Sequence, residues 1–74
     1  MAESYKAAFE QTQAALRDDS GNVELLFRLS VLNAQLGRFD AALALADRAL
    51  AGSPGIAQLH FHRAELLVAL RRSE

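Results

Sequence analysis

The sequence repeats itself with a period of 34 residues, and this period limits the folds open to the chain. When the 74 residues are aligned with themselves at an offset of 34, ten of the 40 overlapping pairs are identical. Roughly four matches are expected by chance, so the period is a genuine signal. Repeats of this length are typical of helix–turn–helix units, which bury their apolar faces only by stacking on neighbouring units.

Glycine and polar clusters divide the chain into four stretches. The clusters lie at 18–22, 37–38 and 52–55. The stretches between them are 4–17, 23–36, 39–51 and 56–72. Their apolar residues recur at spacings of three and four, which indicates amphipathic helices. Asn22 and Ser53 are predicted N-caps, because their side-chain oxygens can accept hydrogen bonds from the free N–H groups of a helix start.

Composition supports an all-α fold and excludes several classes of protein. Helix-favouring Ala, Leu, Arg, Glu and Gln dominate, and the chain has one proline and no cysteine. Without cysteine it has neither disulfides nor thiolate metal sites. The net charge of −1 gives no bulk attraction to nucleic acid or to anionic lipid. No apolar run reaches the roughly 20 residues of a membrane span, and the first residues lack a signal-peptide pattern. We therefore expect a soluble, cytoplasmic protein.

Residues 23–56 carry a recognisable pattern of large and small side chains. Bulky residues, a small residue, a glycine turn, an aromatic, two more small residues and a closing proline follow one another as Leu26, Leu29, Ser30, Gly37, Phe39, Ala42, Ala49 and Pro54. This pattern resembles a complete tetratricopeptide repeat. Residues 4–22 resemble the second helix of a preceding repeat, and residues 57–72 the first helix of a following one. The resemblance implies a single domain over 1–74, an antiparallel stack of about four helices.

Three positions depart from the family pattern. Asn33 and Ala46 stand where large residues are usual, and Arg63 stands at a position that is usually leucine. We therefore expect the fourth helix to be the least firmly packed. Its apolar face is predicted to lack a partner and comprises Leu59, Leu66, Leu67 and Leu70. The alternative is that the four helices close on themselves as a small bundle.

No catalytic or metal-binding constellation is recognisable. The two histidines, His60 and His62, are two residues apart and so point to different sides of a helix. We expect His60 to pack at a helix contact and His62 to be solvated or to touch a partner. Arg63, Arg71 and Arg72 have acidic neighbours and do not form a nucleic-acid patch. No cofactor, metal or enzymatic activity is expected.

The resemblance implies a binding groove. In tetratricopeptide stacks the first helices of successive repeats line a concave face that binds peptides or helices. The matching positions here are Glu24, Phe27, Arg28, Val31, Gln35, Gln58, Phe61, His62, Glu65 and Val68. Phe27 and Phe61 are one period apart and should lie in register; the alternative is that neighbouring helices cover both. Members that bind chaperones clamp a terminal carboxylate with Lys and Asn, and Phe27, Val31 and His62 at those positions argue against such a clamp.

The predicted function is that of a non-enzymatic scaffold or adaptor module that binds a protein or peptide partner in this groove. Neither nucleic acid nor membrane is an expected partner. Two alternatives remain open. The incomplete repeats could pair with another copy, which gives a homo-oligomer, for example a homodimer through the terminal helices, or the chain could be a fragment of a larger repeat protein.

Overall fold

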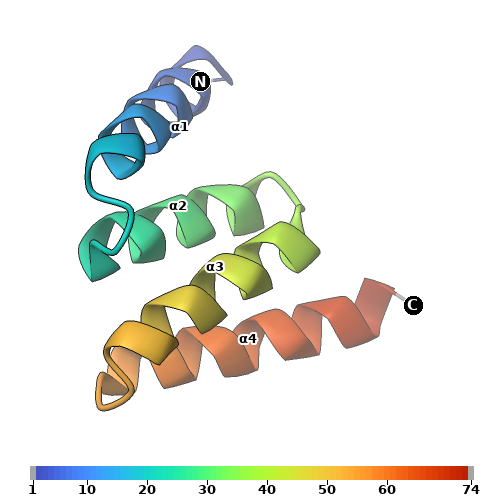
Figure 1. Cartoon of the computed structure of the whole chain (residues 1–74). Helices are drawn as coiled ribbons and strands as arrows, with labels where there is room; N and C mark the ends of the chain where they lie inside the picture. Colours follow the sequence, from blue (N-terminus) through green and yellow to red (C-terminus); the bar gives the residue numbers. More distant parts are fainter. Residues whose placement is uncertain (1, 74) are drawn as a thin grey trace.

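The computed structural model describes residues 2–73, which form four helices joined by short turns. The helices are α1 (Ala2–Asp18), α2 (Val23–Gln35), α3 (Phe39–Gly52) and α4 (Ala57–Ser73). Each helix packs against the next, and α1 and α4 lie at opposite ends of the array (Figure 1). The predicted all-α stack of helix–turn–helix units is confirmed. Because the array is open, the alternative of a closed bundle is wrong.

The turn before α2 and the turn after it show why the helices end where they do. Asn22 caps α2 as predicted, because its Oδ1 accepts a hydrogen bond from the N–H of Leu25 at 3.1 Å. After α2, Gly37 adopts a φ of +79°, which is in the left-handed region that favours glycine. This conformation reverses the chain, and the N–H of Arg38 donates back to the carbonyl of Asn33 at 2.8 Å. Three residues are therefore enough to connect α2 to α3.

Ser53 is not an N-cap, and that prediction was wrong. Its N–H donates to the carbonyl of Ala49 at 2.9 Å, so Ser53 closes α3. The proline that follows begins a separate turn, and α4 begins only at Ala57. At the start of α4, the N–H groups of Leu59 and His60 both donate to the carbonyl of Ile56, at 3.1 and 3.4 Å.

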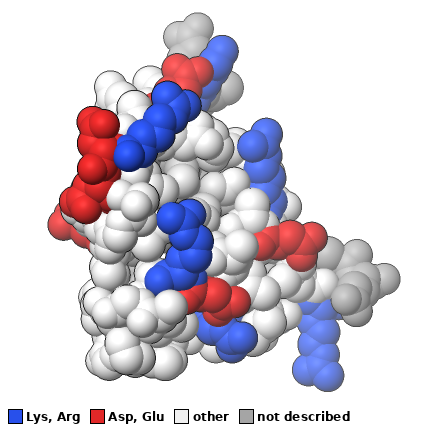
Figure 2. All heavy atoms as spheres, in the orientation of Figure 1, with Lys and Arg blue, Asp and Glu red and all other residues white. Residues whose placement is uncertain are grey.

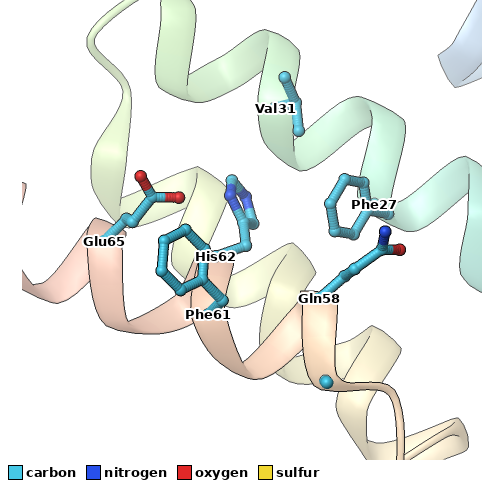
Figure 3. A pocket seen from close by; sticks show the side chains of 7 residues that line it. Phe27, Val31, Gln58, Phe61, His62 and Glu65 are labelled. Atoms are coloured by element: carbon cyan, nitrogen blue, oxygen red, sulfur yellow. The ribbon is translucent and has the colours of Figure 1, made fainter.

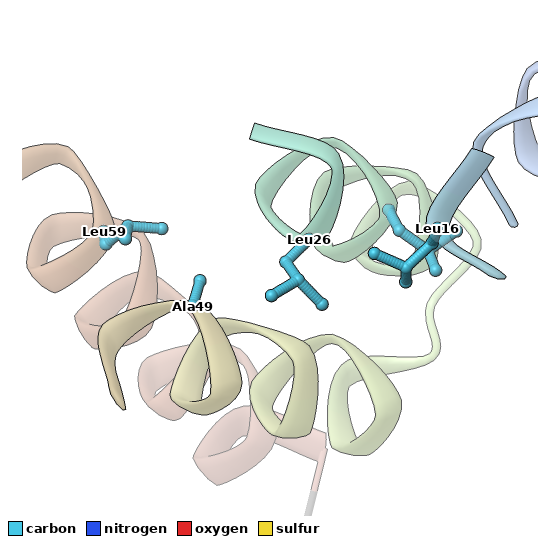
Figure 4. Close-up of a cluster of buried hydrophobic side chains, with 5 residues drawn as sticks. Leu16, Leu26, Ala49 and Leu59 are labelled. Atoms are coloured by element: carbon cyan, nitrogen blue, oxygen red, sulfur yellow. The ribbon is translucent and has the colours of Figure 1, made fainter. Parts of the chain in front are cut away.

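The core is built from leucines that pack against alanines. Its larger buried cluster joins all four helices through Leu16, Leu26, Leu29, Ala49 and Leu59 (Figure 4). A second cluster, formed by Ala42, Ala46 and Leu66, joins α3 to α4. Alanine brings the helix backbones close together without leaving voids, so small residues here are a packing requirement rather than a weakness.

Ser30 and Ala42 form a buried contact between α2 and α3. Both residues are fully buried, and the Ser30 hydroxyl donates to the carbonyl oxygen of Ala42 at 2.6 Å. A larger side chain at either position would push the helices apart. The small residues of the family pattern at these two positions therefore lie where α2 and α3 meet.

The departures from the family pattern are accommodated individually. The buried Asn33 amide donates to the carbonyl of Leu29 at 2.9 Å, so its polar group is not left unsatisfied. Ala46 is fully buried at the contact with α4. Arg63 forms an exposed ion pair with Asp47 of α3, with 2.7 Å between Nε and Oδ1. Arg63 therefore attaches α4 to α3 at its edge instead of filling the core.

The prediction that the apolar face of α4 lacks a partner was partly wrong. Leu59 and Leu66 are seven residues apart, on one stripe of the helix, and both are buried in the core. Leu67 is one residue further, about 100° around the helix axis, and is 41% exposed. Leu70 is half-buried. The large exposed apolar residues described on α4 are thus Phe61, Val68 and Leu67, and of these only Leu67 belongs to the predicted face.

Candidate functional site

The candidate site that collects the predicted groove residues is an open pocket between α2 and α4. It has a volume of about 600 Å³. Its lining consists of Phe27, Val31, Ala57, Gln58, Phe61, His62 and Glu65 (Figure 3). On α2 the lining residues are four apart, and on α4 they recur at three and four, so each set occupies one face of its helix. Six of the predicted groove residues thus surround a single hollow.

The two phenylalanines in this pocket differ in environment. Phe27 is half-buried and packs against the larger core cluster. Phe61, one period later, is 68% exposed. The alternative that neighbouring helices cover both rings is therefore wrong for Phe61. An aromatic side chain this exposed offers apolar surface to a ligand, whereas Phe27 forms the floor on which that ligand would rest.

His62 links the two helices that form the pocket. Its ring centroid lies 5.1 Å from that of Phe27, and its Nε2 lies 2.8 Å from the Ser30 hydroxyl oxygen. Because the single hydroxyl hydrogen of Ser30 is already donated to Ala42, Nε2 must carry the proton in this contact. In neutral His62 the other ring nitrogen, Nδ1, is then a hydrogen-bond acceptor.

The charge state of His62 follows from its surroundings. Burial lowers the pKa of His62 below its ordinary value of 6.5, and the nearby Glu65 carboxylate opposes this effect in part. The ring is therefore mainly neutral at neutral pH. A neutral imidazole stacked near Phe27 extends the apolar wall of the pocket and adds one acceptor to it.

The expected roles of the two histidines are reversed. His60, predicted to pack at a helix contact, is exposed, and its Nε2 donates to the carbonyl of Pro54 at 2.6 Å. His62, predicted to be solvated or to touch a partner, is half-buried against α2. The cause is the rotation of α4 about its own axis, which turns residues 59, 62 and 66 inward.

The remaining predicted groove residues lie around this pocket rather than in it. Glu24 and Arg28 are exposed and form an ion pair at 3.4 Å on the surface of α2. Glu24 also borders an adjoining hollow of about 370 Å³. Gln35 is exposed at the end of α2, away from the pocket. Val68 is 49% exposed one turn beyond Glu65 and shares a third hollow with Phe61.

Two apolar residues near the pocket were missed by the sequence prediction. Ala57 lines the pocket itself, and Ile56 borders the hollow beside Glu24. Both lie at the turn into α4, which the repeat pattern does not mark as groove. An apolar residue directly after the Pro54-Gly55 turn was the available signal.

Other kinds of site find little support in the described part of the chain. On the face shown in Figure 2, basic side chains are interspersed with acidic ones instead of forming one basic surface. Among residues 2–73, no three His, Cys, Asp or Glu side chains are grouped so as to hold a metal ion. Across the same residues, no helix has the length and apolar content needed to cross a membrane.

Antiparallel helix pairs that recur at a fixed spacing and stack in one direction define a helical repeat protein. The family model described as tetratricopeptide repeat matches residues 2–57 and again residues 35–74. The chain belongs to the tetratricopeptide repeat family, whose repeats are generally non-enzymatic protein-interaction modules. Searches of curated proteins and of solved structures gave no match.

Proposed function

We propose that this chain is a non-enzymatic scaffold module that binds a segment of a partner protein in the groove between α2 and α4. The exposure of Phe61 beside the half-buried Phe27 is the observation that carries the proposal. A partially exposed aromatic pair in a hollow is costly to leave in water, and an apolar side chain inserted there recovers about 1.5–3 kcal/mol. The predicted partner therefore presents one large apolar residue to this pocket.

The polar residues around the pocket favour a particular flanking chemistry. Glu65 lies next to Phe61 and His62, and its carboxylate has no ion pair among the described residues (Figure 3). Arg28, the one arginine on this side of α2, is already paired with Glu24. The charge offered to a ligand is thus negative, so a lysine or arginine near the apolar anchor is favoured over an acidic residue.

His62 adds a directional contact to this apolar surface. Its Nδ1 is an acceptor in the tautomer imposed by Ser30. A backbone N–H at the end of a helical peptide, or a side-chain donor, fits such an acceptor. The preferred ligand class is therefore an apolar, weakly basic peptide segment, bound either as a helix or in extended form.

The proposal is tested by selecting peptides from a random display library against the dilute, monomeric chain. The enriched peptides are then titrated against three proteins: the wild type, Phe61→Ala and Leu36→Ala. Leu36 is the matched control, because it is a similarly exposed apolar residue at 47% but lies outside the pocket lining. Glu65→Gln measures the preference for basic peptides.

We expect Phe61→Ala to weaken binding at least tenfold and Leu36→Ala to leave it unchanged. Selected peptides should share a large apolar residue with a nearby basic one, and Glu65→Gln should reduce their affinity severalfold. Binders that tolerate Phe61→Ala but depend on a residue away from α2 and α4 would refute the groove assignment. Failure to select any peptide would refute it as well.

A further inference from the structure

The outer faces of the first and last helices are related by the internal repeat. Two kinds of helix alternate in the stack: α2 and α4 correspond to the first helix of a repeat (first-type), and α1 and α3 correspond to the second (second-type). Helix α3 packs between α2 and α4. Among the described residues, α1 packs against α2, whereas α4 packs against α3 and touches α2 through His62. One face of each terminal helix is therefore left open at an opposite end of the array (Figure 1).

The contact between α2 and α3 shows what such a face requires. Between α2 and α3, the fully buried Ser30 and Ala42 allow close approach, and the buried Ala49 lies in the same cluster as Leu26. Moving the α2 positions forward by 34 residues gives Ala64 for Ser30, and it gives His60 and Arg63 for the buried Leu26 and Leu29. Moving the α3 positions back by 34 gives Ala8 for Ala42, Ala15 for Ala49 and Tyr5 for Phe39.

The shifted positions keep the small residues on which close packing depends. Ala64 on α4 and Ala15 on α1 are both exposed, although their counterparts Ser30 and Ala49 are fully buried. On α4 the exposed Leu67 stands at the position of the buried Asn33, so the open face gains apolar character where α2 has an amide. The open face of α4 thus keeps the small residue of the α2 face that accepts α3 and gains an apolar residue at Leu67, while His60 and Arg63 stand at the positions of Leu26 and Leu29. The open face of α1 resembles that of α3.

We propose that the open face of α4 binds α1 of a second copy of this chain, in the register in which α2 binds α3. Ala64 then lies against Ala8 of the neighbouring copy, as Ser30 lies against Ala42 within one chain. The sequence of helix types continues without interruption from α4 of one copy into α1 of the next. Successive copies are related by two repeat units, or 68 residues of the period.

Such a contact joins two different surfaces, so it is heterologous. The second copy keeps its own α4 face open, and association continues head to tail instead of stopping at a closed dimer. The groove lies between α2 and α4 of one chain, and the contact of α4 with α1 of the next copy does not cover it. Self-association and peptide binding are therefore separable by mutation.

The test uses two complementary single variants of the full chain. Ala64→Arg blocks the α4 face, and Ala15→Arg blocks the α1 face. Both positions are exposed within the chain, and arginine is a good helix former, so each monomer should keep its helical content by circular dichroism. Ala51→Arg is the matched control, because Ala51 is an exposed alanine near the end of α3, away from both faces.

Mass is measured by light scattering from micromolar to millimolar concentration. We expect the wild type and Ala51→Arg to rise steadily above the chain mass of 8.1 kDa and to pass the mass of a dimer. Each blocked variant alone should remain a monomer at all concentrations. An equimolar mixture of the two should form one-to-one pairs and stop there, because it contains one intact α4 face and one intact α1 face.

Three results would overturn the proposal. A wild type that stays monomeric at millimolar concentration means that the open faces do not bind each other. A closed dimer that survives Ala15→Arg means that α4 pairs with α4 of another copy. Blocked variants that do not recombine when mixed, although folded, mean that the two faces are not partners.

Discussion

The two pocket phenylalanines should respond differently to replacement with alanine. Phe61→Ala should mainly weaken ligand binding, and Phe27→Ala should mainly lower stability. Phe61 is 68% exposed, so only about a third of its surface is removed from water on folding. Full burial of a phenylalanine contributes about 1.5–3 kcal/mol, and Phe61→Ala should therefore lower the free energy of unfolding by about 0.5–1 kcal/mol. The loss of ligand binding should be much larger, because the exposed ring is the surface that a ligand would cover.

Phe27→Ala should cost considerably more stability. Core phenylalanines lose about 3–5 kcal/mol on truncation to alanine, and half-burial scales this to about 2 kcal/mol. The ring contact with His62, 5.1 Å between centroids, adds about 0.5–1.5 kcal/mol. We therefore expect a loss of about 2.5–3.5 kcal/mol. Per kcal/mol, the melting temperature of a chain of this size shifts by about 4–8 °C.

The assay is urea and thermal unfolding followed by far-UV circular dichroism on the dilute monomer, with Leu36→Ala as a surface control. The two phenylalanine variants should differ by at least about 1 kcal/mol, with Phe61→Ala close to the control. Equal destabilisation by Phe61→Ala and Phe27→Ala would show that Phe61 is a core residue in solution. That result would refute both the magnitudes and the use of Phe61 as a binding surface.

Three further substitutions test the packing. Leu59→Ala removes a fully buried side chain from the cluster that joins all four helices, and it should lower the free energy of unfolding by about 2–5 kcal/mol in urea titrations. A loss below that of Phe61→Ala would contradict the core assignment. Ser30→Ala removes the hydroxyl that is hydrogen-bonded to both Ala42 and His62. In urea titrations it should lower the free energy of unfolding by about 1–2 kcal/mol. An unchanged free energy would mean that the 2.6 Å hydrogen bond to Ala42 does not stabilise the fold. His62 should make the stability of the fold depend on pH. Because burial lowers the pKa of His62, the folded state binds the proton of this side chain more weakly than the unfolded chain does. The free energy of unfolding should therefore fall as the pH drops from above 6.5 towards the lowered pKa. His62→Gln should flatten this part of the profile, and an unchanged pH dependence in that variant would exclude His62 as its source.

Much of the architecture was predictable because it depends on local chemistry. The 34-residue period, the glycine at position 37 and the Asn22 cap fix where the helices begin and end, since turns and caps are formed by residues close in sequence. The small residues Ser30 and Ala42 were recognisable for the same reason: little else fits where two backbones approach closely. Six predicted groove residues meet at one pocket because equivalent helix faces recur with the repeat.

The errors concern α4 and the turn before it. Ser53 has the chemistry of an N-cap, but the hydrogen bond from its N–H to Ala49 assigns it to the end of α3. The burial of His62 and the exposure of His60 were predicted the wrong way round. Leu59 and Leu66 were likewise expected on a face without a partner, and both are buried in the core.

The sequence by itself determined the number, lengths and order of the helices, the repeat that relates them and the residues available to the groove. Only the tertiary structure decided the rotation of α4 about its axis. Apolar residues occur nearly all around this helix, so no single stripe specifies the buried side. Its rotation is set by contacts from distant parts of the chain: Leu59 and Leu66 in the core, Arg63 with Asp47, and His62 with Ser30. Those contacts leave Phe61 facing outward beside Phe27, where the proposed binding surface lies.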